Sequence, residues 1–392
     1  MLSFLFFFSV VLLSISCAEQ SSSQAETQKP ETPGSGTAAG EERLLSDPGD
    51  PPPGAEREFS TDFSRATVRF DSILSGGPSK DGIPSIDDPG FVSVEEADRW
   101  IEESEPVLLL RYAEHVRIYP LQILMWHEIV NDSIDGDAVA VTYCPLCNTG
   151  VAFRAAVEGT ELTFGTTGRL RYSNLIMYDR QTETWWQQAS GKAIAGRYAG
   201  ITLELLPVTL LSWKQAKDSH PQAEVLSRNT GYSKPYGTNP YEGYDTSSSP
   251  FLYEGPETDG EHDPFERLLF VQAGEEERAY LYGELREKRV VRDHLGGRPI
   301  ALFWASGTSS ALDTGTISKG REVGTAAAHF PFVEDTEEEL TFYWDGNAIR
   351  DRETNSEWSV AGVAVDGQLE GSSLSSPVTV NHLWFSFSAF QE

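Results

Sequence analysis

The feature of this 392-residue chain that most constrains its fold is an internal repeat. Tyr119 and Asp132 recur as Tyr280 and Asp293, each 161 residues further along, and a single register aligns the residues between them. A mostly apolar run follows the Asp in both places. Self-similarity in the same order predicts two copies of one supersecondary unit.

The match resumes downstream after a gap. Leu162-Thr-Phe164 corresponds to Leu340-Thr-Phe342, and Asp179-Arg-Gln-Thr182 corresponds to Asp351-Arg-Glu-Thr354. A Trp and then a Gly follow the second block in each copy. The comparison predicts a first repeat at 59–230, a connection at 231–268 and a degenerate second repeat at 269–392.

Within the first copy, the sequence pattern predicts one helix and several short strands. Apolar residues recur at helical spacing over 119–130. Strands are predicted at 138–143, 150–155, 161–165 and 175–178, separated by Gly and Asp turns. We therefore expect an α+β, β-rich fold in which two tandem copies of one unit pack with pseudo-twofold symmetry.

The N-terminus predicts export and a lipid anchor. Residues 1–16 are almost wholly apolar and too few to span a membrane, which is typical of a signal peptide. Ser14-Ile-Ser-Cys17 is similar to a bacterial lipobox, so we expect the signal to occupy 1–17 and Cys17 to be lipidated. Acyl chains would then hold an extracytoplasmic protein at the cell envelope, and Ala18 favours the outer membrane in a Gram-negative host. The alternative is an ordinary cleaved signal with an incidental cysteine.

A flexible tether is predicted between this anchor and the folded body. Residues 18–58 are rich in Ser, Gln, Glu, Pro and Gly. Such a stretch cannot bury enough apolar surface to offset the entropy that ordering costs. The folded body is therefore expected to begin near Phe59.

Charge and absent motifs exclude several classes of function. The formal net charge is −30, and the chain has no polybasic stretch. This acidity argues against nucleic acid or anionic lipid as a ligand. The sequence also has no Gly-rich phosphate loop, no Gly-x-Ser-x-Gly elbow and no His-Glu-x-x-His helix, so nucleotide use and the commoner hydrolase schemes have no support.

The residues that can carry chemistry gather in the first copy. Two of the three cysteines, Cys144 and Cys147, are separated by Pro and Leu at the end of an apolar run. In the 161-residue register, the second copy has Ala, Thr and Lys where the first has Cys144, Cys147 and His127. The second copy thus keeps the residues that predict the fold but lacks these three side chains, so we expect any chemistry to belong to the first copy.

Three interpretations of the cysteine pair remain open. Two thiolates can bind one metal ion, with His127 as a third ligand and Met177 or Asp179 as the fourth. The thioether of Met177 suits copper, whereas the carboxylate of Asp179 suits zinc or iron. The pair can instead exchange disulfides or respond to oxidants, with His127 lowering a thiol pKa. It can also form a structural disulfide in a noncatalytic surface or assembly protein. His127 and Met177 have ordinary alternatives, as a helix-end histidine and a core methionine.

Charged residues near these positions are candidates for catalytic roles. Glu128, Asp179 and Arg180 can act as general bases or bind substrate beside a metal or thiol site. Asp179 and Arg180 recur in the copy without cysteines, which favours a structural turn. Glu128 has no acidic counterpart, because Arg289 occupies that register position.

The connection between the copies is rich in tyrosine, at 232, 236, 241 and 244. Such a segment can cover a site or bind a ligand, or it can be a packed linker.

Four blocks carry a resemblance to a known family. The blocks are His127-Glu-Ile-Val-Asn-Asp132, Tyr143-Cys-Pro-Leu-Cys147, Met177-Tyr-Asp-Arg-Gln-Thr182 and Trp186-Gln187. Over roughly residues 85 to 390 the chain resembles the bacterial domain-of-unknown-function family numbered 3179. It departs from the pattern at Asn148 and within Gly165-Thr-Thr-Gly168. The resemblance implies a shared fold and an exported setting, and it supplies no activity.

Overall fold

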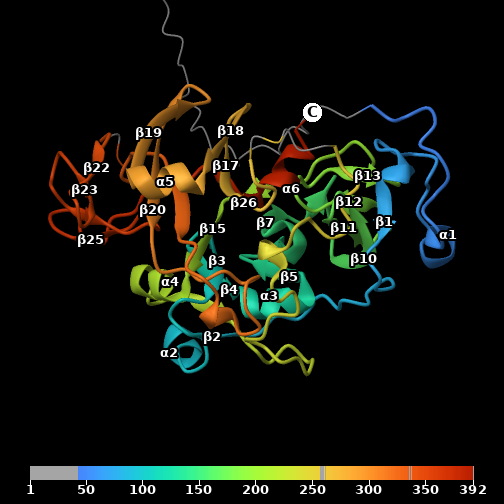
Figure 1. Cartoon of the computed structure of the whole chain (residues 1–392), viewed down its shortest axis with the longest axis horizontal. Helices are drawn as coiled ribbons and strands as arrows, with labels where there is room; N and C mark the ends of the chain where they lie inside the picture. The colour runs from blue at the N-terminus through green and yellow to red at the C-terminus, as the bar shows by residue number, and fades with distance from the viewer. Residues whose placement is uncertain (1–42, 257–259, 261, 335, 337, 392) are drawn as a thin grey trace, which may run out of the picture. The chain divides into compact units, whose positions relative to one another are not determined.

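The computed structural model describes residues 43–256, 260, 262–334, 336 and 338–391 (Figure 1). The predicted signal peptide, Cys17 and most of the predicted tether lie outside the described residues. The last part of that tether is described, and it includes the short helix α1 (Ala55–Glu58), whose Ala55 is buried. No helix in the described part of the chain is long and apolar enough to cross a membrane.

The protein is rich in β-structure, with 40% of the described residues in strands and 13% in helices, which confirms the predicted β-rich class. Among the described residues, three sheets and one two-stranded ribbon lie in the first half. One five-stranded sheet has the order β15-β3-β4-β16-β2 (Val208–Ser212, Pro106–Tyr112, His115–Pro120, Glu224–Leu226, Phe91–Ser93), and the other has the order β1-β10-β11-β12-β13 (Ile73–Ser75, Phe164–Arg171, Asn174–Asp179, Trp185–Gln187, Ala193–Ala195). The four-stranded sheet has the order β14-β7-β6-β5 (Leu205–Leu206, Thr149–Arg154, Asp137–Cys144, Ile129–Ile134). The ribbon is β8-β9 (Ala156–Val157, Thr160–Glu161).

The second half holds three further sheets. Their orders are β18-β17-β26 (Glu276–Leu281, Arg267–Ala273, Val378–Leu383), β19-β20-β21 (Val290–Leu295, Arg298–Ala305, Thr325–His329) and β22-β23-β24-β25 (Phe342–Trp344, Ile349–Asp351, Glu357–Trp358, Ala364–Asp366). The other α-helices of the described residues are α2 (Val94–Ala97), α3 (Leu121–His127), α4 (Trp213–Ser219), α5 (Tyr282–Lys288) and α6 (Trp384–Ser388). Short 3-10 turns lie at Phe70–Ser72, Pro145–Cys147, Tyr244–Thr246 and Ile317–Lys319.

The order of elements recurs along the chain at the spacing of the sequence repeat. The bounds of β17, β18, α5, β19 and β20 are those of β3, β4, α3, β5 and β6 moved by 161 residues. The helix that follows β4 is shorter than the predicted 119–130, because Tyr119 and Pro120 still belong to the strand. Glu128 ends α3 in the left-handed conformation at φ 58°, and Arg289 likewise ends α5 at a positive φ of 64°.

A hydrogen bond between a tyrosine and an aspartate recurs at this turn of the chain in both halves. The Tyr119 hydroxyl donates to Asp132 Oδ2 over 2.6 Å, and the Tyr280 hydroxyl donates to Asp293 Oδ2 over 2.8 Å. Tyr119 is fully buried, whereas Tyr280 is half-buried. The same hydrogen bond is therefore buried in the first half and partly exposed to solvent in the second.

We expect Tyr119→Phe to lower the free energy of unfolding by about 2 kcal/mol, because it leaves the buried Asp132 carboxylate without one donor. Tyr280→Phe is the matched control and should cost clearly less, since water can reach Asp293. Urea unfolding of the two variants at neutral pH measures the difference. Equal losses would contradict the role given to burial.

Candidate functional site

The cysteine pair lies in the turn that joins β6 to β7. β6 ends at Cys144, the 3-10 turn Pro145–Cys147 follows, and Asn148 closes it in the left-handed conformation at φ 53°. Proline suits the first position of such a turn, because its φ is already fixed and its missing N–H has no partner to lose there. Both cysteines are free thiols, exposed by only 2% and 0%.

A second hairpin supplies polar partners to the two sulfurs. β10 and β11 are joined by Tyr172 and Ser173, both at positive φ, as a two-residue hairpin turn requires. The Ser173 carbonyl oxygen lies within hydrogen-bond distance of both sulfurs, 3.7 Å from Cys144 Sγ and 3.5 Å from Cys147 Sγ, so either thiol can donate to it. The Asn174 Nδ2 then donates to Cys147 Sγ over 3.5 Å. One turn therefore contacts both sulfurs and distinguishes between them.

The hydrogen bonds make the two thiols unequal. Burial raises the pKa of Cys147, but donors from Cys144, Ser386 and Asn174 outweigh it, and the net pKa lies below the ordinary value. For Cys144, burial raises the pKa, and the bond to Cys147 and the charge there raise it further. The first thiolate of the pair is therefore expected on Cys147, with Cys144 as its proton donor.

Glu128 lies beside this pair, and the path of the chain explains why. Its carbonyl oxygen accepts from the backbone N–H of Tyr143 over 2.8 Å, which ties the end of α3 to β6 next to Cys144. Burial raises the pKa of the Glu128 carboxyl well above its ordinary value, the electrostatic interaction with Cys144 raises it further, and a hydrogen bond with Tyr241 opposes both effects. The carboxyl is thus held in its neutral form next to a thiol.

A cavity of about 440 Å³ reaches this group. It is bordered by Glu128 and by Leu146, the residue just before Cys147. Its other walls come from the 76–83 segment, the β10–β11 hairpin and the tyrosine-rich connection (Gly76, Pro78, Ile83, Thr166, Gly168, Arg169, Leu170, Leu175, Pro240, Tyr241, Glu242, Gly243, Tyr244, Ser247, Phe251). Most of this wall is apolar, so the cavity suits a small molecule with few polar groups.

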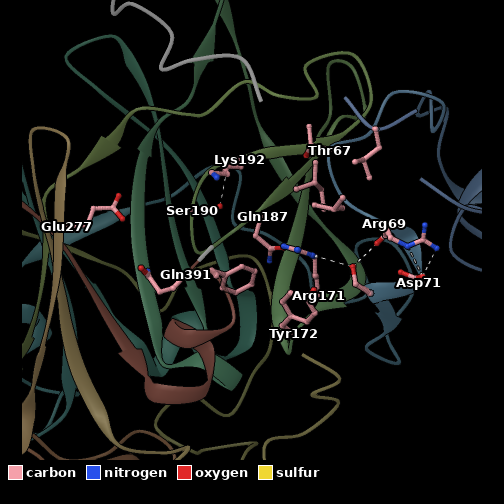
Figure 2. Close-up of a pocket in the computed structure, with 15 residues that line it drawn as sticks. Thr67, Arg69, Asp71, Arg171, Tyr172, Gln187, Ser190, Lys192, Glu277 and Gln391 are labelled. Carbon is pink, nitrogen blue, oxygen red and sulfur yellow. Dashed lines mark hydrogen bonds and ion pairs between the residues drawn. The ribbon is translucent and has the colours of Figure 1, made fainter. Parts of the chain in front are cut away.

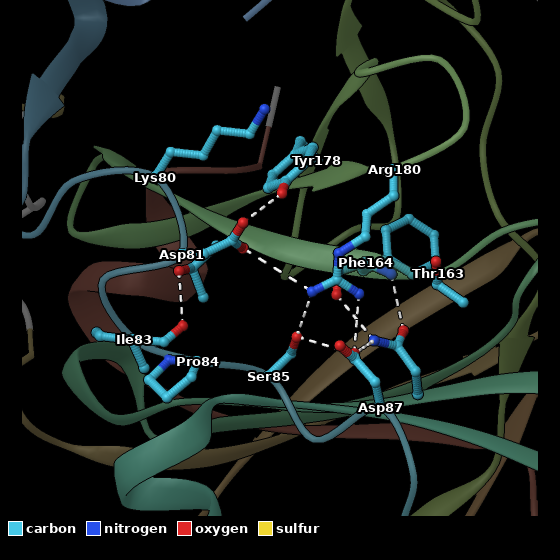
Figure 3. A network of polar contacts seen from close by, with 12 residues as sticks. Lys80, Asp81, Ile83, Pro84, Ser85, Asp87, Thr163, Phe164, Tyr178 and Arg180 are labelled. Carbon is cyan, nitrogen blue, oxygen red and sulfur yellow. Dashed lines mark hydrogen bonds and ion pairs between the residues drawn. The ribbon is translucent and has the colours of Figure 1, made fainter. Parts of the chain in front are cut away.

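The segment at 78–87 forms one wall of the cavity and is fixed by a polar network (Figure 3). The Arg180 guanidinium donates to Asp87 and to Ser85, each over 2.8 Å. The Tyr178 hydroxyl donates to Asp81 Oδ2 over 2.5 Å. Arg180, a predicted catalytic candidate, therefore holds this segment in place, at the side of the cavity formed by residues 78–87.

We expect Gly168→Ala to displace this wall and to destabilise the protein by about 2 kcal/mol or more. A Cβ at Gly168 would lie 2.0 Å from the carbonyl oxygen of Pro78, and the residue has φ 69°. Gly136→Ala is the matched control, with φ 84° and nothing within 4 Å of a Cβ, so it should lose only the cost of the backbone conformation, about 1 kcal/mol. Thermal unfolding compares them, and equal losses would argue against a close contact at Pro78.

The predicted nitrogen ligand is engaged elsewhere. His127 Nδ1 lies 2.7 Å from the carbonyl oxygen of Pro84, and Nε2 lies 2.7 Å from the Tyr236 hydroxyl. Burial lowers the pKa of His127, so the ring is held neutral. Both ring nitrogens thus serve the packing of α3 against the 78–87 segment and the connection.

The other predicted residues are also placed. Met177 is fully buried in the same apolar core as the cysteines. The Asp179 carboxylate accepts from Thr182 and from the Trp186 indole, and Asp351 makes the same bonds with Thr354 and Trp358 (3.0 Å to each indole). Among the described residues, no group of three or more His, Cys, Asp and Glu side chains could hold a metal ion. Of the candidates, the structure brings Glu128 together with Cys144 and Cys147.

Sequence reasoning missed several residues of the site. Asn174, Ser173 and Ser386 contact or polarise the sulfurs, but single polar residues at a turn and in the last helix carry no pattern. Tyr241 belongs to the tyrosine-rich connection, whose composition does give a signal. Asp245 explains the position of this connection. Its buried carboxylate accepts from Arg267 and Arg321, and these ion pairs anchor the connection beside the site.

The fold and the site define a β-rich protein with a buried pair of free thiols next to a neutral carboxyl. The chain belongs to the family described as Protein of unknown function (DUF3179), whose model matches residues 80–392. This match confirms the resemblance seen in the sequence blocks. Comparison with curated proteins gives no match, and comparison with solved structures gives none either.

Proposed function

We propose that this protein is a thiol–disulfide oxidoreductase that passes a Cys144–Cys147 disulfide to other thiols. The observation that supports it best is that the two sulfurs have different hydrogen-bond partners and pKa shifts of opposite direction. Cys147 Sγ accepts the Asn174 amide hydrogen bond, while Cys144 interacts electrostatically with the Glu128 carboxyl, whose pKa burial raises. A stabilised thiolate in the reduced form makes a dithiol pair a stronger oxidant, because reduction then becomes more favourable.

The proposed step starts from the oxidised protein. A substrate thiolate attacks Cys147 Sγ, the Cys144–Cys147 bond breaks, and its electron pair stays on Cys144 Sγ, which takes the Glu128 proton. A second substrate thiolate then attacks the substrate sulfur of the mixed disulfide, and Cys147 leaves as a thiolate. The two substrate sulfurs become joined, the protein gains two electrons, and the Glu128 carboxylate regains its proton from solvent.

The experiment is a redox titration in mixtures of oxidised and reduced glutathione. We expect one cooperative two-electron transition, seen as a loss of about 2 Da of mass in the oxidised protein, and a midpoint more oxidising than that of glutathione. Oxidised Cys144→Ser should accumulate a mixed disulfide at Cys147, since the resolving sulfur is gone. Thiols that stay reduced across the whole range would overturn the proposal.

The second candidate function is metal binding by the same two sulfurs. It is favoured because both sulfurs lie near one backbone carbonyl oxygen, that of Ser173. Both thiols point to the Ser173 carbonyl oxygen, and two soft thiolates suit copper(I). A zinc or iron site would need further ligands, from Met177, Asp179 or His127 after rearrangement. Copper(I) competition against a chelator tests it, with Cys147→Ser expected to abolish binding and Met177→Leu showing whether the thioether takes part.

We further propose that the protein is exported and lipid-anchored through Cys17, and that its matching elements are two tandem copies of one unit with pseudo-twofold symmetry. The apolar N-terminal run and the common 161-residue spacing support these points. Labelled fatty acid should enter the wild type and be absent from Cys17→Ser. Equal labelling would end the lipoprotein proposal.

A further inference from the structure

A cavity of about 840 Å³ lies where α4, β20 and the sheet β22-β23-β24-β25 meet (Figure 1). Its volume is toward the upper end of the range for small-molecule sites in proteins, about 300–1,000 Å³. It shares no lining residue with the cavity at Glu128. A ligand bound here is therefore separate from the thiol chemistry.

The wall of this cavity uses repeat positions that also line the cavity at Glu128. Four of its residues are counterparts in the sequence repeat: Arg289 for Glu128, Gly307 for Leu146, Trp344 for Thr166 and Asn347 for Leu175. The strand pairing agrees, because Thr166 pairs with Met177 in β10–β11 and Trp344 pairs with Ile349 in β22–β23. An acid, two leucines and a threonine are thus replaced by a cation, a glycine, an indole and an amide. The cavity therefore suits another class of ligand.

Trp344 presents an open ring in this wall. It is 37% exposed, which makes it one of four exposed large apolar side chains in the described part of the chain. Val365, 42% exposed, is another of the four and borders the same cavity. An exposed indole in a concave site can stack on the apolar face of a ring-shaped ligand.

A different cavity, of about 550 Å³, lies beside Arg171, Tyr172 and Gln187 and lacks such a ring (Figure 2). Its aromatic residues, Tyr172 and Phe390, are half-buried, and the Arg171 guanidinium lies 4.4 Å and 5.6 Å from their ring centres. Gln187 is only 1% exposed. The open aromatic face thus distinguishes the cavity at Trp344.

Arg289 lies beside this face with its hydrogen-bond donors unused. Its guanidinium is 4.4 Å from the ring centre of Trp304 and 5.6 Å from that of Trp344. The half-buried side chain forms no hydrogen bond or ion pair with another described residue. The two indoles therefore support a guanidinium whose N–H groups are available to oxygen acceptors.

The three carboxylates of the wall already have cationic partners (Asp218 with Lys214 at 2.6 Å, Glu357 with Arg350 at 2.8 Å, Glu103 with Lys217 at 3.8 Å). Their negative charge disfavours an anionic ligand, whereas an uncharged ligand leaves these ion pairs intact. Asn347 and Ser306 are exposed in the same wall, and neither side chain hydrogen-bonds to another residue that the structure describes. These neutral groups can both donate to and accept from hydroxyl groups.

We propose that this cavity binds an uncharged saccharide with equatorial hydroxyl groups, a β-linked glucan fragment in chemical class. In such a pyranose ring the two faces carry only C–H bonds, so one face can stack on Trp344. The oxygens at the edge of the ring accept from Arg289 and exchange hydrogen bonds with Asn347 and Ser306. This binding does not depend on the proposed redox function.

Calorimetry of the full chain with cellotriose tests the proposal. We expect a Kd of about 1 mM or tighter, and at least about tenfold weaker binding of sorbitol, which has hydroxyl groups but no ring face. Glucuronate should bind no more tightly than glucose, because the carboxylates of the wall oppose its charge.

Variants of the wall assign the contacts. Trp344→Ala should weaken cellotriose binding about tenfold or more, Trp344→Phe should restore most of it, and Arg289→Gln should weaken it severalfold. Tyr232→Ala is the matched control, because it removes another exposed ring, 46% exposed, that borders neither this cavity nor the one at Glu128. Circular dichroism establishes that each variant is folded.

Four results would overturn the proposal: no binding of cellotriose, equal binding of sorbitol, tighter binding of glucuronate than of glucose, or undiminished binding by folded Trp344→Ala. The double variant Cys144→Ser/Cys147→Ser should bind cellotriose as the wild type does. Failure of the redox function and failure of this site are therefore distinguished.

Discussion

The reduced protein is expected to ionise its two thiols in well separated steps, with Cys147 first. Hydrogen bonds donated to Cys147 outweigh the effect of burial, so its pKa lies below that of an ordinary cysteine, which is about 8.5. Burial and the neighbouring thiolate raise the pKa of Cys144 well above that value. Thiolate absorbance near 240 nm, followed as pH rises, should therefore show one thiolate forming below the pKa of an ordinary cysteine, about 8.5, and a second forming only well above it.

Serine variants assign the steps. Cys147→Ser should lose the early thiolate, and its alkylation by iodoacetamide at about pH 7 should be at least about tenfold slower, because only the thiolate reacts. Cys144→Ser keeps a hydroxyl that can donate to Cys147, so most of the early step should remain. Asn174→Leu, which removes the 3.5 Å amide donor, should raise the pKa of Cys147. A single step involving both sulfurs, or an early thiolate that survives Cys147→Ser, would refute the unequal pair.

Much of the fold was predictable, because it rests on local pattern and on repetition. The strands predicted at 138–143 and 175–178 appear as β6 and β11, and the β-rich class follows from many short apolar runs. The helix boundary was wrong at both ends. Tyr119 and Pro120 pair with Leu108 and Val107 in β3–β4, and a strand ladder outweighs apolar spacing that also fits a helix.

The site was predictable only in part. The Cys144–Cys147 spacing and the missing counterpart of Glu128 indicated three residues that the structure brings together, because all three differ from the residues at the matching positions 161 residues further along. The contacts of His127 were not predictable, because sequence proximity to Glu128 does not say which way each side chain points. In α3 the ring turns to Pro84 and Tyr236, both distant in sequence. Such contacts are set by tertiary packing, which no local pattern records.

Replacing Glu128 by glutamine is expected to change both the stability and the chemistry of the protein. In the folded state the pKa of Glu128 is raised by burial, so between about pH 4.3 and that raised pKa the folded protein holds a proton that the unfolded chain has lost. Stability from this group is therefore present at low pH and falls as pH rises through that window. The amide in the Glu128→Gln variant is neutral at all pH, so the variant should gain up to about 1.4 kcal/mol per pH unit relative to the wild type within the window.

The same substitution removes the acid beside Cys144. Without its proton, Cys144 must leave the disulfide as a bare thiolate in an apolar site, and loss of general acid catalysis typically costs about 10²–10⁴-fold in rate. We expect single-turnover reduction of the oxidised variant by glutathione at about pH 6 to slow by about 100-fold, with the gap narrowing as pH rises and wild-type Glu128 ionises. Glu242→Gln is the matched control, since this exposed carboxyl lines the same cavity and should alter neither stability nor rate. Urea unfolding at about pH 5 and about pH 8 and stopped-flow reduction measure both effects. A stability difference that does not grow with pH would mean that Glu128 is ionised in the folded state, and unchanged reduction rates would remove it from the proposed step.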